Sequence, residues 1–110
     1  MAKYVIRFMP EYHATSLWAC NDDAYSDLGI NIEYEKVGLS QELINQLEKF
    51  DDGVMDIIDW SDPGGESPLT SEEQMALYNE GCRLLELVRK ELGDEFEVEN
   101  ELGWIKPFGS

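Results

Sequence analysis

The chain has 110 residues and a formal charge of −16, from 24 acidic and 8 basic side chains, and 43% of its residues are hydrophobic. A chain of this length buries about 65% of its unfolded surface, so the apolar content predicts one folded domain rather than a disordered acidic tail. The charge disfavours nucleic acids and anionic membranes as partners and favours basic proteins. We recognise no membrane span and no signal peptide, and we expect a cytoplasmic protein.

Two strands and an irregular segment are predicted in the first third of the chain. The run KYVIRF, within residues 3–9, is rich in β-branched and aromatic residues and predicts a strand whose outer face carries Lys3 and Arg7. Residues 10–29 have no clean periodicity and are expected to be irregular, with a turn at the triplet NDD. Residues 30–37 alternate apolar and polar side chains, which indicates a possible half-buried strand.

Two long helices are predicted next, joined by a loop at residues 60–70. The first covers residues 40–59, begins at the N-cap Ser40 and repeats apolar side chains at every third or fourth position. Gly53 interrupts it at a cost of about 1 kcal/mol relative to alanine, so we expect a kink or break there. The second helix covers residues 71–92 and begins with a T-x-x-E capping box.

The last predicted element is a strand at residues 95–102, followed by a tail at 103–110. One face of this strand is strongly acidic, and its members are Glu95, Glu97, Glu99 and Glu101. Because neighbouring like charges repel, we expect Lys3 and Arg7 to lie opposite them, which pairs the first strand with the last. The resulting prediction is an α+β fold: a small, mainly antiparallel sheet with two long helices packed on one face.

The acidic run DIIDWSDPGGE has a superficial likeness to a calcium-binding loop. An EF-hand loop supplies oxygen ligands at every second position, whereas Asp56, Asp59 and Asp62 are spaced by three. On a helix that spacing fans the carboxylates over about 120° rather than converging them on one ion. Pro63 disfavours a helical Asp62, so turn formation accounts for the two glycines that follow. We therefore expect no metal site.

No set of residues with a catalytic or cofactor-binding pattern is apparent. The single histidine, His13, cannot form a metal cluster, and Cys20 and Cys82 lie far apart without zinc-ligand spacing. No glycine-rich phosphate loop precedes a helix. Carboxylate pairs are abundant, but none stands in an apolar setting that would raise a pKa. The sequence predicts neither enzymatic activity nor a cofactor.

The end of the first long helix and the loop after it form the candidate partner interface. Its acidic members follow one another with no basic residue among them: Asp51, Asp52, Asp56, Asp59, Asp62 and Glu66. Carboxylates at a helix C-terminus oppose the helix dipole at about 0.3–1 kcal/mol each, and we hypothesise that their potential serves a partner. Trp60 is the expected apolar anchor within this rim. The glutamate face of the last strand is the weaker alternative, because Lys3 and Arg7 partly neutralise it.

Five stretches of the chain carry a family resemblance: YVIRFMPEY, SLWACNDDAYSDLG, LSQELINQL, DWSDPGGESP and EEQMALYNEGCRLLELVRKELGDEFEVE. Together they cover most of residues 4–99. In that order they resemble small acidic bacterial immunity proteins encoded beside polymorphic toxins, including those of contact-dependent growth inhibition systems. Gly38 stands where patterns of this group often carry a proline. The shared motifs are structural and none is a catalytic signature.

The resemblance implies an inhibitor that binds and neutralises a cognate toxin domain. Many such toxins are nucleases, whose clefts must be basic to hold phosphates, and an acidic inhibitor is drawn to such a cleft. Composition alone leaves an alternative open, in which the chain is an acidic nucleic-acid mimic or regulatory protein that binds a basic host protein. In neither reading does the chain bind nucleic acid, a membrane, a metal or a cofactor.

Overall fold

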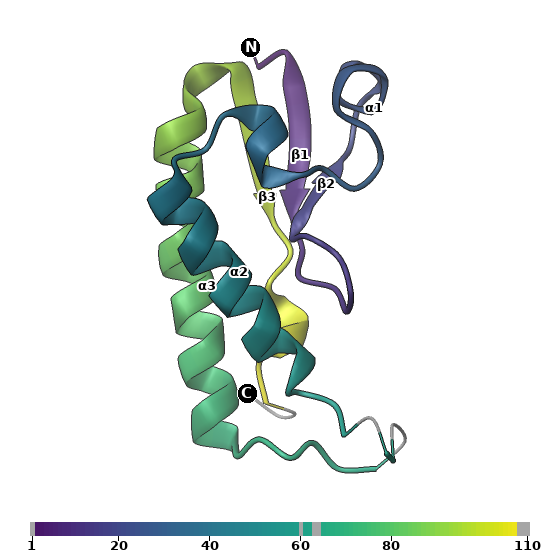
Figure 1. Ribbon diagram of the computed structural model, residues 1–110, viewed down its shortest axis with the longest axis vertical. Helices are drawn as coiled ribbons and strands as arrows, with labels where there is room; N and C mark the ends of the chain where they lie inside the picture. The colour runs from purple at the N-terminus through teal and green to yellow at the C-terminus, as the bar shows by residue number, and fades with distance from the viewer. Residues whose placement is uncertain (1, 60, 63–64, 108–110) are drawn as a thin grey trace.

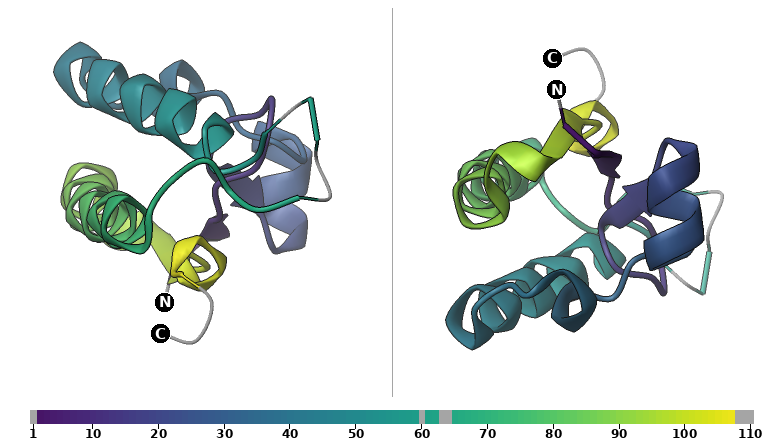
Figure 2. Two further views of the ribbon diagram at one scale, coloured as in Figure 1. Left: turned by 90° about the horizontal axis from the view of Figure 1, so that it is seen from below. Right: turned by 90° about the horizontal axis from the view of Figure 1, so that it is seen from above.

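The computed structural model describes residues 2–59, 61–62 and 65–107. The strands in these residues are β1 (Tyr4–Phe8), β2 (Leu17–Ala19) and β3 (Phe96–Asn100). The α-helices are α1 (Asp22–Leu28), α2 (Gln41–Met55) and α3 (Ser71–Leu92), and the 3-10 helices are η1 (Tyr34–Val37), η2 (Gly93–Glu95) and η3 (Gly103–Ile105). The fold is α+β, with α2 and α3 side by side against the sheet (Figures 1 and 2).

The sheet is mixed and has the strand order β2-β1-β3. The first and last strands pair as predicted, and Arg7 stands in register with Glu99. Their pairing is parallel, whereas β1 and β2 are antiparallel, so the prediction of a mainly antiparallel sheet is only roughly matched. The reason is the helical hairpin: α2 and α3 run in opposite directions, and the chain leaving α3 turns back into the direction of β1 (Figure 1). Lys3 does not lie opposite the glutamates as expected, since its ammonium lies 3.7 Å from the Asp27 carboxylate of α1.

The prediction that residues 10–29 are irregular is wrong, because they contain β2 and α1. The triplet NDD begins a helix rather than a turn. The Asn21 side chain accepts a hydrogen bond from the backbone N–H of Ala24 (3.0 Å), and two aspartates in the first turn favour the positive helix end. Gly29, with φ 89°, ends the helix in a conformation that side chains rarely adopt.

The prediction of a strand at residues 30–37 is also wrong. The chain makes one isolated bridge, between Trp18 and Asn31, and then turns into η1. Ile32 and Tyr34 are buried as the alternation predicts, but Ile30 is 67% exposed. Tyr34 points into a polar cluster described below, and the short 3-10 helix places it there in a way that a continuous strand would not.

Helix α2 begins at Ser40 as predicted, and Ser40 Oγ accepts a hydrogen bond from the backbone N–H of Leu43. It ends at Met55 rather than at residue 59. Just after Met55, the backbone N–H groups of Asp56 and Ile57 donate to carbonyl oxygens three residues earlier. The predicted break at Gly53 does not occur. A Cβ at that position would lie 3.2 Å from Leu77 Cδ1 of α3, so the glycine permits close helix contact.

Helix α3 spans Ser71–Leu92, the range predicted, and carries the expected capping box between Thr70 and Glu73. Gly81 lies where α3 crosses α2 and the segment after β3. A Cβ on Gly81 would stand 2.9 Å from Phe50 and 3.0 Å from Leu102, so only glycine fits this crossing without repacking.

Candidate partner interface

Asp51 is half-buried at the centre of a polar cluster, and it also lines a surface depression with Asp52. Its carboxylate accepts hydrogen bonds from the Ser16 hydroxyl (2.6 Å) and the Tyr34 hydroxyl (2.5 Å). The backbone N–H of Ser16 donates to the Tyr34 hydroxyl oxygen (2.9 Å), which closes a three-residue network. Ser16 and Tyr34 are 0% and 2% exposed. The network joins the loop before β2 and the turn η1 to α2, so Asp51 stabilises the fold, and its place in the interface stays a prediction.

The surroundings of Asp51 change its protonation. Burial raises the pKa of the Asp51 carboxyl to about 6, and the negative charges of Asp52 and Glu48 add to the rise. Hydrogen bonds from Ser16 and Tyr34 act in the opposite direction, because they stabilise the carboxylate. The expectation that no carboxylate has a raised pKa is therefore wrong. Sequence reasoning missed this site because its partners come from two distant segments.

The remaining described acids of the predicted interface form what we call the acidic arc. All of them are exposed, and they are Asp52, Asp56, Asp59, Asp62 and Glu66. Asp56 caps the C-terminus of α2, where its charge opposes the helix dipole. Asp59 accepts hydrogen bonds from the Ser61 hydroxyl (2.6 Å) and the Ser61 N–H (3.0 Å), which lower the pKa of its carboxyl. These two hydrogen bonds therefore favour the charged form of Asp59.

The predicted anchor of the arc, Trp60, lies outside the described residues, and its role stays a prediction. The described side chains nearby form an open depression of about 500 Å³ between Asp56 and Asp59 on one side and Pro68 and Leu69 on the other. Ile58 also lines it. Carboxylates and apolar groups therefore meet at this surface, a composition suited to the edge of a protein interface.

The glutamate face of β3 is the second acidic surface. Glu97 and Glu99 of β3 and Glu101 just after it are all exposed. Arg7 stands beside Glu99 in the adjacent strand. Burial raises the pKa of the nearby Cys20 thiol, Glu99 raises it further, and Arg7 lowers it. Arg7 therefore stands opposite a glutamate of this face, where the sequence placed it, while Lys3 does not.

A third exposed group lies at the C-terminal end of the described chain. Trp104 in η3 is 41% exposed, and its ring meets that of Tyr12 edge-to-face with centroids 5.6 Å apart. The two residues are far apart in sequence, and Tyr12 lies in a segment without periodicity. No local sequence pattern could have paired them.

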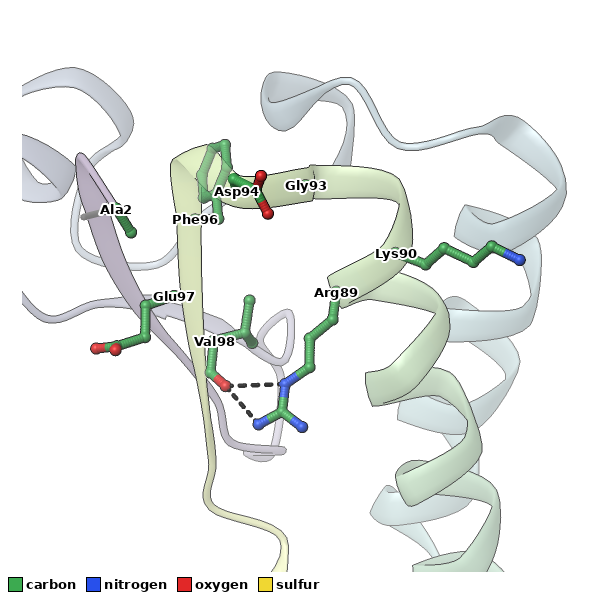
Figure 3. Close-up of a pocket in the computed structure, with 8 residues that line it drawn as sticks. All are labelled: Ala2, Arg89, Lys90, Gly93, Asp94, Phe96, Glu97 and Val98. Carbon is green, nitrogen blue, oxygen red and sulfur yellow. Dashed lines mark hydrogen bonds between the residues drawn. The ribbon is translucent and has the colours of Figure 1, made fainter.

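The pocket at the end of α3 is lined by charges of both signs. Figure 3 shows Arg89 reaching from α3 toward β3, where its Nε and Nη2 atoms donate to the Val98 carbonyl oxygen (3.1 and 2.7 Å). Lys90, Asp94 and Glu97 complete the charged lining of this cavity of about 590 Å³. Arg89 thus satisfies a backbone acceptor on the outer edge of the sheet, so its guanidinium serves the fold.

The described residues contain no group of three or more His, Cys, Asp or Glu side chains arranged to hold a metal ion. None of the helices in the described part of the chain is long and apolar enough to cross a membrane.

Comparison with known proteins gives the family. The model of the Serratia CdiI immunity protein-like family matches residues 4–100, from the first residue of β1 to the last residue of β3. The chain therefore belongs to this family of immunity proteins of contact-dependent growth inhibition. No curated protein matches the chain.

Proposed function

We propose that this chain neutralises a basic nuclease toxin by binding it through the acidic arc. The observation that carries the proposal is the family match, which spans the whole sheet and all three helices. An immunity protein of contact-dependent growth inhibition inhibits a toxin, and this one carries a charge of −16. A nuclease holds phosphates in a basic cleft, so an acidic inhibitor complements it.

Electrostatic steering speeds the association of such an inhibitor with its toxin. Complementary potentials raise association rates toward about 10⁸–10⁹ M⁻¹s⁻¹ at low salt, against about 10⁵–10⁶ M⁻¹s⁻¹ for neutral partners. The acidic arc concentrates five exposed carboxylates, and the sequence has no basic residue between Lys49 and Arg83. The glutamate face of β3 is a poorer source of steering, because Arg7 stands beside Glu99.

Inhibition by binding requires no catalytic group in the inhibitor. The described side chain best tuned for acid–base chemistry is Asp51, with its raised pKa. Both of its carboxylate oxygens are engaged by Tyr34 and Ser16, which ties the group to the packing of the fold. The proposal therefore assigns the protein a binding role alone.

The proposal is tested with the toxin domain encoded by the neighbouring gene. The chain and a catalytically silenced form of that domain are co-expressed and purified, and we expect a stable complex. Active toxin should cleave nucleic acid in its assay, and the chain should stop that cleavage at a one-to-one ratio. A toxin that degrades no nucleic acid would contradict the nuclease assignment, and the absence of a complex would contradict the proposal as a whole.

A further inference from the structure

We infer that the apolar centre of the toxin interface is the aromatic pair Trp104–Tyr12, and that it receives a basic side chain of the toxin domain. This inference rests on the proposed function, which supplies the partner. It moves the anchor away from the position that sequence reasoning assigned to Trp60. Three features of the molecule support it: the pair is rigid, acidic side chains lie nearby, and the chain's own lysines pack over aromatic rings.

The pair is fixed in position and open to solvent. The indole Nε1 of Trp104 donates a hydrogen bond to the Pro10 carbonyl oxygen (3.0 Å), which connects η3 to the loop between β1 and β2. Tyr12, in the same loop, meets the indole at an interplanar angle of 71°. Although its N–H is engaged, Trp104 remains 41% exposed. A rigid, exposed tryptophan is the kind of side chain that dominates binding energy at interfaces.

The pair is continuous with the acidic arc. Next to Tyr12 in the chain, Glu11 and His13 line a depression of about 260 Å³ together with Asp51 and Asp52 near the end of α2. The loop that carries Tyr12 therefore contacts η3 through Trp104 and also borders the first acid of the arc. Figure 1 shows this loop and η3 beside the C-terminal end of α2. An aromatic centre thus adjoins a carboxylate rim.

The chemistry of this surface favours a cation. Arginine and lysine bind aromatic faces and pair with nearby carboxylates, and the attraction grows when water is excluded. The chain itself holds two lysines over aromatic rings, one of them also beside a carboxylate. Lys3 lies 5.1 Å from the ring of Tyr4 and 3.7 Å from Asp27, and Lys106 lies 4.7 Å from the ring of Tyr78. Trp104 and Tyr12 offer an aromatic surface to an external cation, and Glu11, next to Tyr12 in the chain, offers a carboxylate.

The test compares two exposed aromatic residues at different sites. Trp104→Ala removes the proposed anchor, and Tyr25→Ala on α1 is the control, since Tyr25 is 48% exposed. Affinity for the silenced toxin domain of the neighbouring gene is measured by calorimetry. We expect Trp104→Ala to weaken binding by at least about 30-fold, the effect of removing a hot-spot residue, and Tyr25→Ala by less than about twofold.

Two further measurements keep the inference decidable. Trp104→Phe loses the hydrogen bond to Pro10 but retains an aromatic face, so it should retain more affinity than Trp104→Ala. If Trp104→Ala fails to fold, hydroxyl-radical footprinting of the wild-type complex decides, with protection expected at Trp104 and not at Tyr25. A folded Trp104→Ala variant that binds as tightly as wild type, or an unprotected Trp104, overturns the inference. In either event wild-type binding still upholds the proposed function, which fails only if the wild-type chain does not bind.

Discussion

Asp51 and Asp52 are neighbours on the same helix, yet they belong to two regions with different roles. Asp51 faces inward and accepts hydrogen bonds from Tyr34 and Ser16. Asp52 faces outward and begins the acidic arc. Successive helical residues differ by about 100° in direction, so one position decides between a carboxylate that joins segments and one that creates surface potential. Residue type does not distinguish them, but Asp51 lies four residues after the buried Leu47 and three before the buried Val54.

The largest effect is expected from removing a donor of the buried cluster. Tyr34→Phe deletes the hydrogen bond to Asp51 and the acceptor for the Ser16 N–H. Leaving these buried groups unpaired should lower the free energy of unfolding by about 3–4 kcal/mol. Urea denaturation measures the loss, and the control is Tyr25→Phe at an exposed site. Equal stability of the two variants would show that the cluster does not hold the fold.

Charge reversal in the acidic arc should change binding and spare the fold. Asp52→Lys, Asp56→Lys and Asp59→Lys together should slow association with the toxin domain by about 10–100-fold at low salt and flatten its salt dependence. Stopped-flow mixing at several salt concentrations measures both quantities. Glu97→Lys with Glu99→Lys on β3 is the matched control. A greater loss of rate in the control would place the steering surface on the sheet instead.

The smallest effect concerns pH and isolates Asp51. In the folded chain this carboxyl keeps its proton to about pH 6, whereas its ordinary pKa is 3.8. The folded state therefore binds more protons between these values, and the stability from this group, present at low pH, is lost as pH rises through 6. We expect a loss of about 1–2 kcal/mol, less than the full shift implies because the group is only partly buried. Asp51→Asn should abolish this component, measured as the difference between the two urea-denaturation profiles against pH.

The parts of the fold that follow from local signals were predictable. Helix α3 has a capping box, a regular apolar stripe and a glycine at its end, and its predicted range coincides with Ser71–Leu92. The strand pattern at residues 95–102 located β3, and cross-strand charge relief paired it with β1. Helix α1 could also have been found, because an asparagine N-cap followed by two aspartates is a helix start.

The remaining features depend on contacts between distant residues. Alternation at residues 30–37 indicated which side chains are buried, but not that Tyr34 would reach Ser16 and Asp51 through a 3-10 turn. The direction of β3 depends on how the two long helices turn, which no single segment encodes. The pairing of Trp104 with Tyr12 arises in the same way, from opposite ends of the chain. The acids of the arc were predicted as a group, but the half-buried polar cluster around their neighbour Asp51 was not.

The strand order has a consequence for how the protein is made in the cell. β1 is the central strand, and its parallel neighbour β3 follows it only after β2, α1, α2 and α3 have been made, at Phe96–Asn100. Contacts between such distant residues slow folding, so the helical hairpin can assemble during synthesis while the sheet waits for the C-terminal strand. Chains released before Phe96 lack Val98, Leu102 and Ile105, which are all buried. A chain still in synthesis therefore cannot complete the sheet or its core until β3 and η3 have been made.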